Sequence, residues 1–241
     1  MKPQLIVALD IDTFQEAQRI VAALGDSVDI YKVGSQLFTS CGRDIIHYLI
    51  GEKKRIFLDL KFHDIPNTVA NAVRSAILLM EDHSALLMLT LHTIGGKEML
   101  QAAAKAAQET AGHLKIQKPL LVGVTVLTSD APKDNIRAVI LERAQLAKDS
   151  GLDGVVASAQ EAAFIREKFG KDFVIVTPGI RPEGADAGDQ KRVTTPGQAI
   201  KNGSNFLVVG RPILQASDPR QAARDILDDI KKDLGDSRYK A

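Results

Sequence analysis

Cysteine is almost absent from this sequence: Cys41 is the only one in 241 residues. A single cysteine excludes an internal disulfide and any metal site built from several cysteines. Cys41 falls on an apolar helical stripe, so we expect it to be buried as a small hydrophobic side chain. The five histidines also lack the His-x-x-x-His spacing of a metal site, and no metal ion is predicted.

A strong charge bias and long apolar runs are missing as well. The net charge is +1, which gives no electrostatic case for nucleic acid or an anionic membrane as a partner. The longest apolar runs are far shorter than a membrane span, and the chain enters a strand-like run within a few residues, without a secretion signal. We therefore expect a cytoplasmic protein.

Eight short apolar runs, each followed by an amphipathic helical pattern, divide the sequence. This pattern is typical of parallel strands buried on both faces. No Gly-x-Gly-x-x-Gly follows the first run, which disfavours a doubly wound open sheet. No linker divides the chain, so residues 1–241 are predicted to form a single (β/α)8 (TIM) barrel domain of the α/β class. The expected strands are 5–9, 30–33, 56–58, 86–91, 120–127, 154–157, 173–176 and 206–209.

Helix signals follow several of these strands. Pro66, with Asp64 just ahead of it, is expected to open the helix after the third strand, because proline favours the first helical position. After the second strand, one helical stripe consists of Phe38, Cys41, Ile45 and Leu49.

The most informative stretch is Asp59-Leu60-Lys61-Phe62-His63-Asp64, at the end of the third strand. Side chains alternate along a strand, so Asp59 and Lys61 are predicted to share a face. With Lys32 from the second strand and Asp64, they could form an alternating array whose members keep one another charged. An ordinary strand-end ion pair plus a helix-capping aspartate explains this stretch alone equally well. Asp59 with another aspartate could also hold Mg²⁺, but two nearby lysines compete for the carboxylates.

In (β/α)8 barrels the active site lies at the carboxyl ends of the strands. In this sequence nearly every strand ends on a group that can hydrogen bond or carry charge. A strand-end salt bridge explains one pair of these groups, but it does not explain a ring. His92 fits either a rim contact or a satisfied core residue. The ring consists of Asp10, Lys32, Asp59, Lys61, His92, Thr128, Ser158, Arg181 and Arg211.

One side of this ring is predicted to bind phosphate. Arg181 and Arg211 follow strands seven and eight, where such barrels often bind phosphate, and Gly179 and Gly210 would let backbone N–H groups approach an anion. Segment 181–193 is predicted to be a lid, because a loop of this length in a compact domain is typically functional. A disordered surface insertion is the alternative.

The other side of the ring is suited to carbanion chemistry. A lysine held charged beside a reacting carbon can stabilise negative charge there and then deliver a proton. An aspartate fixed nearby would repel an anionic group of the substrate, such as a carboxylate. Loss of that carboxylate as CO2 would relieve the repulsion.

In their order along the chain, these motifs closely resemble the orotidine 5'-phosphate decarboxylase family. The Asp-x-Lys pattern is shared by a wider group of phosphate-sugar barrels, but the full set is highly specific. Ala157-Ser158 is a small departure, because many relatives have Cys before Ser. The segments that carry the resemblance are 8–10, 31–34, 59–68, 122–129, 177–181 and 208–212.

The resemblance implies conversion of orotidine 5'-monophosphate (OMP) to UMP and CO2, the last step of de novo pyrimidine biosynthesis, without metal or organic cofactor. It implies that Lys61 donates the proton to C6 and that Asp59 lies against the substrate carboxylate, with Lys32 and Asp64 completing the charged array. It also implies a homodimer in which Asp64 and Thr68 reach the neighbouring subunit's site. The implied substrate contacts are Asp10, Lys32, Thr68, Thr128, Ser158, Arg181, Gln190, Gly210 and Arg211.

Two other functions remain open at this point. One is a metal-dependent sugar-phosphate epimerase or lyase of the same barrel group. The other is a barrel that binds a nucleotide and senses it without chemistry, although the intact Asp59, Lys61 and Asp64 set argues against it.

Overall fold

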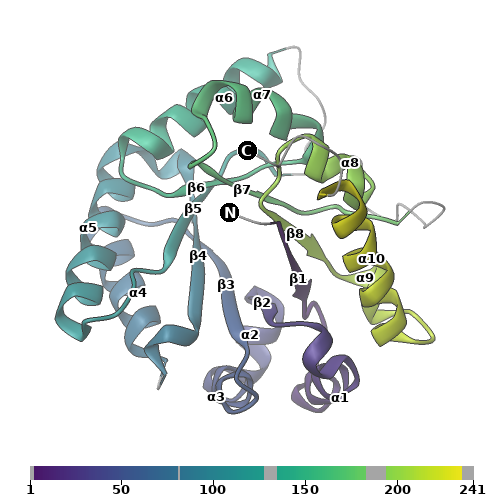
Figure 1. Ribbon diagram of the computed structural model, residues 1–241. Helices are drawn as coiled ribbons and strands as arrows, with labels where there is room; N and C mark the ends of the chain where they lie inside the picture. The colour runs from purple at the N-terminus through teal and green to yellow at the C-terminus, as the bar shows by residue number, and fades with distance from the viewer. Residues whose placement is uncertain (1–2, 81, 128–134, 183–193, 235–241) are drawn as a thin grey trace.

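A computed structural model of the protein describes residues 3–80, 82–127, 135–182 and 194–234. The strands are β1 (Gln4–Ala8), β2 (Ile30–Gly34), β3 (Arg55–Phe62), β4 (Leu86–His92), β5 (Leu120–Val124), β6 (Gly154–Val156), β7 (Val174–Thr177) and β8 (Phe206–Val209). Each strand pairs in parallel with the next, and β8 pairs with β1 (Figure 1). The sheet is therefore a closed barrel, which confirms the predicted (β/α)8 fold.

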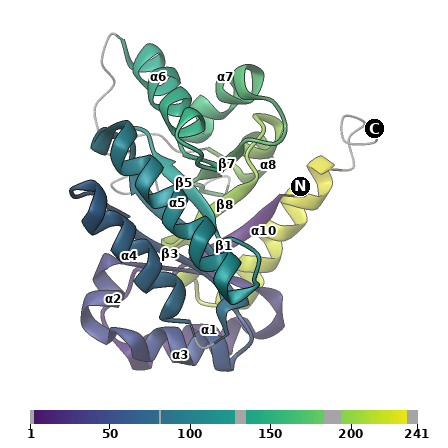
Figure 2. The same cartoon turned by 90° about the vertical axis from the view of Figure 1, so that its left-hand side faces the viewer.

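The helices surround the strands (Figure 1), and α4 and α5 lie side by side on the outside of the barrel (Figure 2). Their bounds are α1 (Phe14–Leu24), α2 (Ser35–Cys41), α3 (Arg43–Gly51), α4 (Pro66–Leu78), α5 (Gly96–Leu114), α6 (Ile136–Asp149), α7 (Ala159–Phe169), α8 (Pro196–Lys201), α9 (Arg211–Leu214) and α10 (Pro219–Leu234). Short 3₁₀ turns are η1 (Gly25–Ser27), η2 (His83–Ala85) and η3 (Thr93–Gly95). No helix in the described part of the chain has the length and apolar character needed to cross a membrane.

Successive side chains of a strand face opposite sides, and this alternation divides the core in two. In β1, Leu5 and Val7 pack with the helices, whereas Ile6 and Ala8 belong to a separate cluster inside the barrel. Because each strand is covered on both faces, its residues form a nearly continuous apolar run. The inner cluster contains Ile6, Ala8, Ile30, Phe57, Met88, Val122, Val174, Val176, Phe206 and Val208.

The helical stripe after the second strand belongs to two helices, so the prediction of one is wrong. Gly42 separates α2 from α3 and has a φ of 55°, in the left-handed region that favours glycine. Cys41 is the last residue of α2 and is half-buried, although the sequence predicted a buried position. The apolar period alone does not reveal such a break, because it continues across Gly42.

The fifth strand is shorter than the predicted segment 120–127. β5 ends at Val124, opposite Val156 at the end of β6. Thr125 then leaves the ladder: its backbone N–H and its hydroxyl donate to the carbonyl of Val156 at 3.3 and 3.0 Å. The short partner strand therefore ends the pairing before the apolar run itself ends.

Candidate active site

The inward-facing side of the strands changes from apolar to polar at their carboxyl ends. Two residues beyond the last inward apolar side chains of β1, β2 and β3 come Asp10, Lys32 and Asp59. Since side chains alternate with a period of two, all three point into the same space. With Lys61 they line a cavity of about 510 Å³, a volume typical of sites for small molecules.

Four charged side chains form a continuous chain along one wall of this cavity. The ammonium of Lys32 lies 2.7 Å from Oδ1 of Asp10 and 3.5 Å from Oδ2 of Asp59. The ammonium of Lys61 lies 2.8 Å from the same Oδ2. Acid and base alternate along this chain, so each group is adjacent to one of opposite charge.

Asp59 is the buried centre of this array. Burial opposes ionisation of its carboxyl group, but the charges of Lys32 and Lys61 and hydrogen bonds from Lys61 and Thr90 outweigh burial and hold its pKa below the ordinary value of 3.8. The hydroxyl of Thr90 donates to Oδ1 of Asp59 at 2.9 Å. Asp59 is therefore a fixed negative charge at neutral pH.

Lys61 reaches the array from an irregular part of β3. Leu58 pairs with Leu89 and Phe62 with Leu91, so β3 carries two more residues than β4 across this step. The backbone at Lys61 has a φ of 50°, which is uncommon for any residue with a side chain. Simple alternation correctly placed the Lys61 side chain beside Asp59, but it did not predict this bulge.

Another wall of the cavity, beside Asp10, carries two arginines and two glycines. It includes Arg181 and Arg211, which follow β7 and β8, together with Gly179 and Gly210. Arg181 is buried, and its backbone N–H donates to the carbonyl of Thr194 at 3.0 Å. Two guanidinium groups beside glycine backbone, where no side chain blocks the N–H donors, suit an anion such as phosphate.

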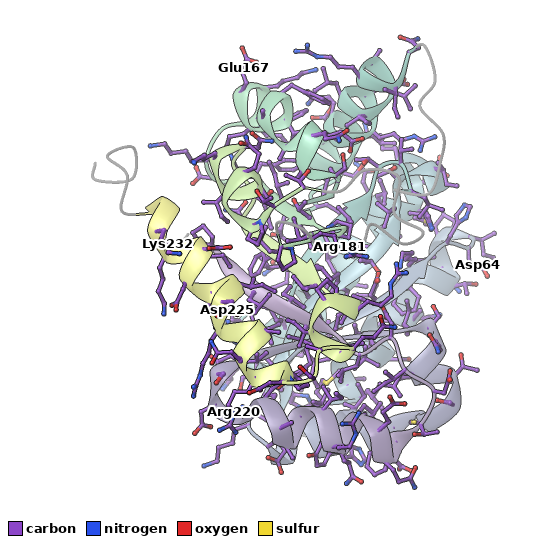
Figure 3. All side chains as sticks on the ribbon, turned by 90° about the vertical axis from the view of Figure 1, so that its right-hand side faces the viewer. Asp64, Glu167, Arg181, Arg220, Asp225 and Lys232 are labelled. Atoms are coloured by element: carbon purple, nitrogen blue, oxygen red, sulfur yellow. The ribbon has the colours of Figure 1, made fainter. Side chains whose placement is uncertain are left out.

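Asp64 and Thr68 lie outside this cavity. Both are exposed, and Figure 3 shows Asp64 at the outer edge of the molecule, whereas Arg181 lies toward its middle. Oδ1 of Asp64 accepts a hydrogen bond from the backbone N–H of Ile65 at 2.6 Å, and no ion pair joins Asp64 to another part of the described chain. Within one chain the second carboxylate of the array is therefore Asp10, although the sequence predicted Asp64 in that position.

The remaining predicted substrate contacts are Ser158, which the structure describes, and Thr128 and Gln190, which it does not. Ser158 is fully buried at the start of α7 and is not on the cavity wall; its backbone N–H donates to the carboxylate of Glu161 at 2.9 Å. The backbone of Ser158 thus caps α7, whereas its buried hydroxyl has no hydrogen-bond partner among the described residues. A substrate contact of Ser158 stays a prediction. Thr128, Gln190 and almost all of the predicted lid 181–193 lie outside the described residues.

His92 is half-buried beside the array, 6.0 Å from the ring of His63. Burial, together with the neighbouring charges of His63 and Lys61, lowers its pKa below the ordinary value of 6.5. The neutral imidazole is therefore the prevailing form at neutral pH. His92 does not line the cavity, so of its two predicted roles the geometry favours a packed residue behind the wall.

Comparison with known proteins matches this chain to the orotidine 5'-phosphate decarboxylase / HUMPS family over residues 3–226. The chain belongs to this family. The orotidine 5'-phosphate decarboxylase of Moorella thermoacetica is 45% identical over 240 residues, covering 95% of this chain and 93% of the relative. That of Actinobacillus pleuropneumoniae is 46% identical over 234 residues, covering 94% and 98%.

Solved structures of this family have the same fold. The crystal structure of orotidine 5'-phosphate decarboxylase from Lactobacillus acidophilus matches with a TM-score of 0.80 and 37% identity, covering 95% of this chain and 99% of that one. The enzyme from Pyrococcus horikoshii matches with a TM-score of 0.75 and 26% identity, covering 94% and 99%. The match to the family therefore includes the whole barrel and both walls of the cavity.

Sequence reasoning missed Thr90, although a signal for it exists. Thr90 follows Met88 by two residues, and Met88 belongs to the cluster inside the barrel. The same alternation that placed Asp59 and Lys32 thus points Thr90 into the interior, beside Asp59. A threonine in an apolar strand run attracts no attention by itself, because threonine is common in strands.

The metal prediction rests on side-chain chemistry alone. Across the described ranges, no three histidine, cysteine, aspartate or glutamate side chains gather into a group that could hold a metal ion. Asp59 is already bound by two ammonium groups and a hydroxyl. The absence of a metal requirement stays a prediction.

Proposed function

We propose that this protein decarboxylates orotidine 5'-monophosphate to UMP and CO2, the last step of UMP biosynthesis, without a cofactor. The relatives named above support the substrate. The observation that carries the proposal is the ammonium of Lys61, held 2.8 Å from the carboxylate of Asp59 on the wall of the cavity. Neither a sugar-phosphate epimerase nor a nucleotide sensor is favoured by any feature of this site.

The charged array can lower the barrier to loss of CO2. With the substrate carboxylate against Asp59, two negative charges face each other, and breaking of the bond from C6 to the carboxylate carbon removes one of them. The electron pair of the broken bond stays on C6, where Lys61 stabilises it and then delivers a proton. Lys32 lies between Asp10 and Asp59 and keeps both carboxylates in place, with Asp10 near the ribose.

The other wall binds the phosphate. Arg181, Arg211 and the backbone of Gly210 are the proposed contacts, and Thr128 and Gln190 are proposed as further substrate contacts. Binding energy from a phosphate far from C6 can fix the pyrimidine ring against the array. Segment 181–193, of which residues 183–193 lie outside the described part of the chain, is proposed to be a lid whose closure would exclude water from the reacting carbon.

We further propose a homodimer in which Asp64 and Thr68 complete the neighbouring site. Both side chains face solvent in the single chain, and two large apolar side chains are exposed nearby: Ile65 at 66% and Ile94 at 55%. A symmetric interface would bury these residues and bring Asp64 to a partner's array. The whole chain is proposed to act as a single catalytic domain in the cytoplasm, with no nucleic acid or membrane partner.

The deciding experiment uses metal-stripped protein in EDTA with orotidine 5'-monophosphate at neutral pH. The change in pyrimidine absorbance and the release of CO2 are followed together, with the Lys61→Ala variant as the control. Fast turnover by the wild type and almost none by Lys61→Ala are expected. Tight binding without turnover would indicate a sensor. Neither binding nor turnover would contradict the proposed substrate, and the metal-dependent sugar-phosphate reactions would then be tested.

Subunit mixing tests the placement of Asp64. Lys61→Ala and Asp64→Ala are each expected to be inactive. If Asp64 acts across the interface, mixing them gives hybrid dimers with one intact site and on the order of a quarter of wild-type activity. No recovery in dimers shown to exchange subunits would place Asp64 in its own subunit's site.

A further inference from the structure

Thr90 joins the two central residues of the site without contacting the cavity. Its hydroxyl donates to Oδ1 of Asp59 at 2.9 Å and accepts the backbone N–H of Lys61 at 2.8 Å. The side chain is fully buried, and it is not among the residues that line the cavity. The same hydroxyl therefore donates a hydrogen bond to Asp59 and accepts one from Lys61. Only a side-chain group that can both donate and accept can do this.

The bulge in β3 explains why such a group is needed at this position. The pairing of β3 with β4 is interrupted between Leu58 and Phe62, so Lys61 has no paired residue on β4, and its N–H donates to the hydroxyl of Thr90 instead. A buried N–H without an acceptor is costly, and Lys61 is also held in the left-handed region. Thr90 lies on the β4 segment opposite the bulge and supplies the missing acceptor.

The same hydroxyl fixes the direction of the Asp59 carboxylate. Oδ2 faces both lysine ammonium groups, and Oδ1 is bound by Thr90. Because the Thr90 hydroxyl holds Oδ1, the carboxylate is kept from rotating away from the ammonium of Lys61. The backbone that carries Lys61 and the anion that faces its ammonium thus share one anchor.

We propose that Thr90 is a positioning residue for the decarboxylation: it holds the Lys61 backbone and the Asp59 carboxylate in reactive alignment. This inference rests on the proposed decarboxylation, and it adds a residue that does not touch the substrate. Loss of the hydroxyl should impair the chemical step more than binding, because the phosphate wall is unaffected.

The test compares Thr90→Val with Thr90→Ser. Valine keeps the shape but lacks the hydroxyl, and serine restores it. We expect Thr90→Val to lower kcat by roughly 10- to 100-fold with KM changed less than about threefold, and Thr90→Ser to return kcat to within about fivefold of wild type. Thr110→Val is the matched control, since Thr110 is also buried and its hydroxyl donates to the carbonyl of Ala106 at 2.7 Å, away from the site.

A second readout is independent of turnover. Hydrogen exchange of the Lys61 backbone amide, followed in the free protein by NMR, should be faster in Thr90→Val than in wild type by at least about tenfold. Thr110→Val should leave it unchanged. If the wild type does not turn over orotidine 5'-monophosphate, the proposed function fails, and this exchange rate still decides whether Thr90 holds the Lys61 backbone.

The outcomes separate positioning from folding. A kcat for Thr90→Val equal to that of Thr110→Val would overturn the proposal, as would equal losses in Thr90→Val and Thr90→Ser. If Thr90→Val does not fold, Thr90→Ala replaces it with the same expected split between kcat and KM. Failure of both to fold while Thr90→Ser folds would assign the hydroxyl to folding and also overturn the proposal.

Discussion

The ammonium of Lys61 lies 2.8 Å from the carboxylate of Asp59, although the backbone at Lys61 is in the left-handed region with a φ of 50°. For a residue with a Cβ, this conformation costs about 1–2 kcal/mol. Strain of this kind persists where the surrounding structure enforces it, and here it occurs at the residue to which we assign proton transfer. Asp59 and Thr90 on either side of Lys61 supply the contacts that keep it there.

The strain predicts different stabilities for two inactive variants. Lys61→Ala and Lys61→Gly both remove the ammonium, so both should lose nearly all turnover. Glycine adopts positive φ without penalty, so Lys61→Gly should be more stable than Lys61→Ala by about 1 kcal/mol in urea unfolding. Lys53 has a similar φ of 56° at an exposed site. Lys53→Gly should be more stable than Lys53→Ala by the same amount, and both variants should keep full activity. If Lys61→Gly is instead less stable than Lys61→Ala, the left-handed backbone at Lys61 is not strained.

The absence of a side chain at Gly34 leaves room for the ammonium of Lys32. A Cβ at this position would lie 3.0 Å from Nζ of Lys32 and 3.4 Å from Oδ1 of Asp10. The backbone of Gly34 has a φ of −92°, which alanine adopts freely. We expect Gly34→Ala to lower kcat/KM on the order of tenfold by displacing the ammonium, with unfolding changed by less than about 1 kcal/mol. Gly51→Ala is the control, because a Cβ there meets nothing within 4 Å; equal activity of the two variants would contradict the crowding argument.

Arg211 is predicted to contribute binding energy rather than chemistry. Arg211→Ala should raise KM for orotidine 5'-monophosphate by roughly 10- to 1000-fold, because a charged hydrogen bond to the phosphate is lost. Binding of a nucleoside analogue without phosphate should not change. Arg224→Ala, at an exposed position of α10, is the control and should match wild type. If the analogue lacking phosphate is weakened as much as the nucleotide, Arg211 does not bind the phosphate.

Periodicity made the barrel and most of one cavity wall predictable. Asp10, Lys32 and Asp59 continue the inward positions of apolar strands, and a period of two is visible in the sequence. The bulge at Lys61 could not be predicted, because it depends on the pairing of β3 with β4, which is distant in sequence. The break at Gly42 is local, but the apolar period continues across it. The inward position of Thr90 could be predicted from the period of two, but its hydrogen bond to the Lys61 N–H depends on the bulge and could not.

The ion pairs of Asp59 make stability depend on acid pH. Burial opposes its ionisation, but Lys32, Lys61 and the bonded hydroxyl of Thr90 outweigh burial and keep the pKa below 3.8 in the folded chain. The unfolded chain therefore binds a proton first, so this contribution is complete above pH 3.8 and is lost as the pH falls through the folded pKa. Asp59→Asn lacks the titrating group, so its unfolding free energy should fall less steeply below pH 4 or so than that of wild type. Parallel curves for the two proteins would mean that the pKa of Asp59 is not lowered.

His92 should report the charges behind the cavity wall. Burial lowers its pKa below 6.5, and the neighbouring His63, with Lys61, lowers it further because two positive charges close together repel. In an NMR titration the midpoint of His92 should lie below 6.5 and should rise in His63→Gln, which removes the neighbouring charge and leaves the array intact. His113→Gln, at an exposed position of α5, should leave the midpoint unchanged. A midpoint of His92 that falls in His63→Gln would show that His63 stabilises the imidazolium form, and the two rings would then share a proton instead of repelling each other.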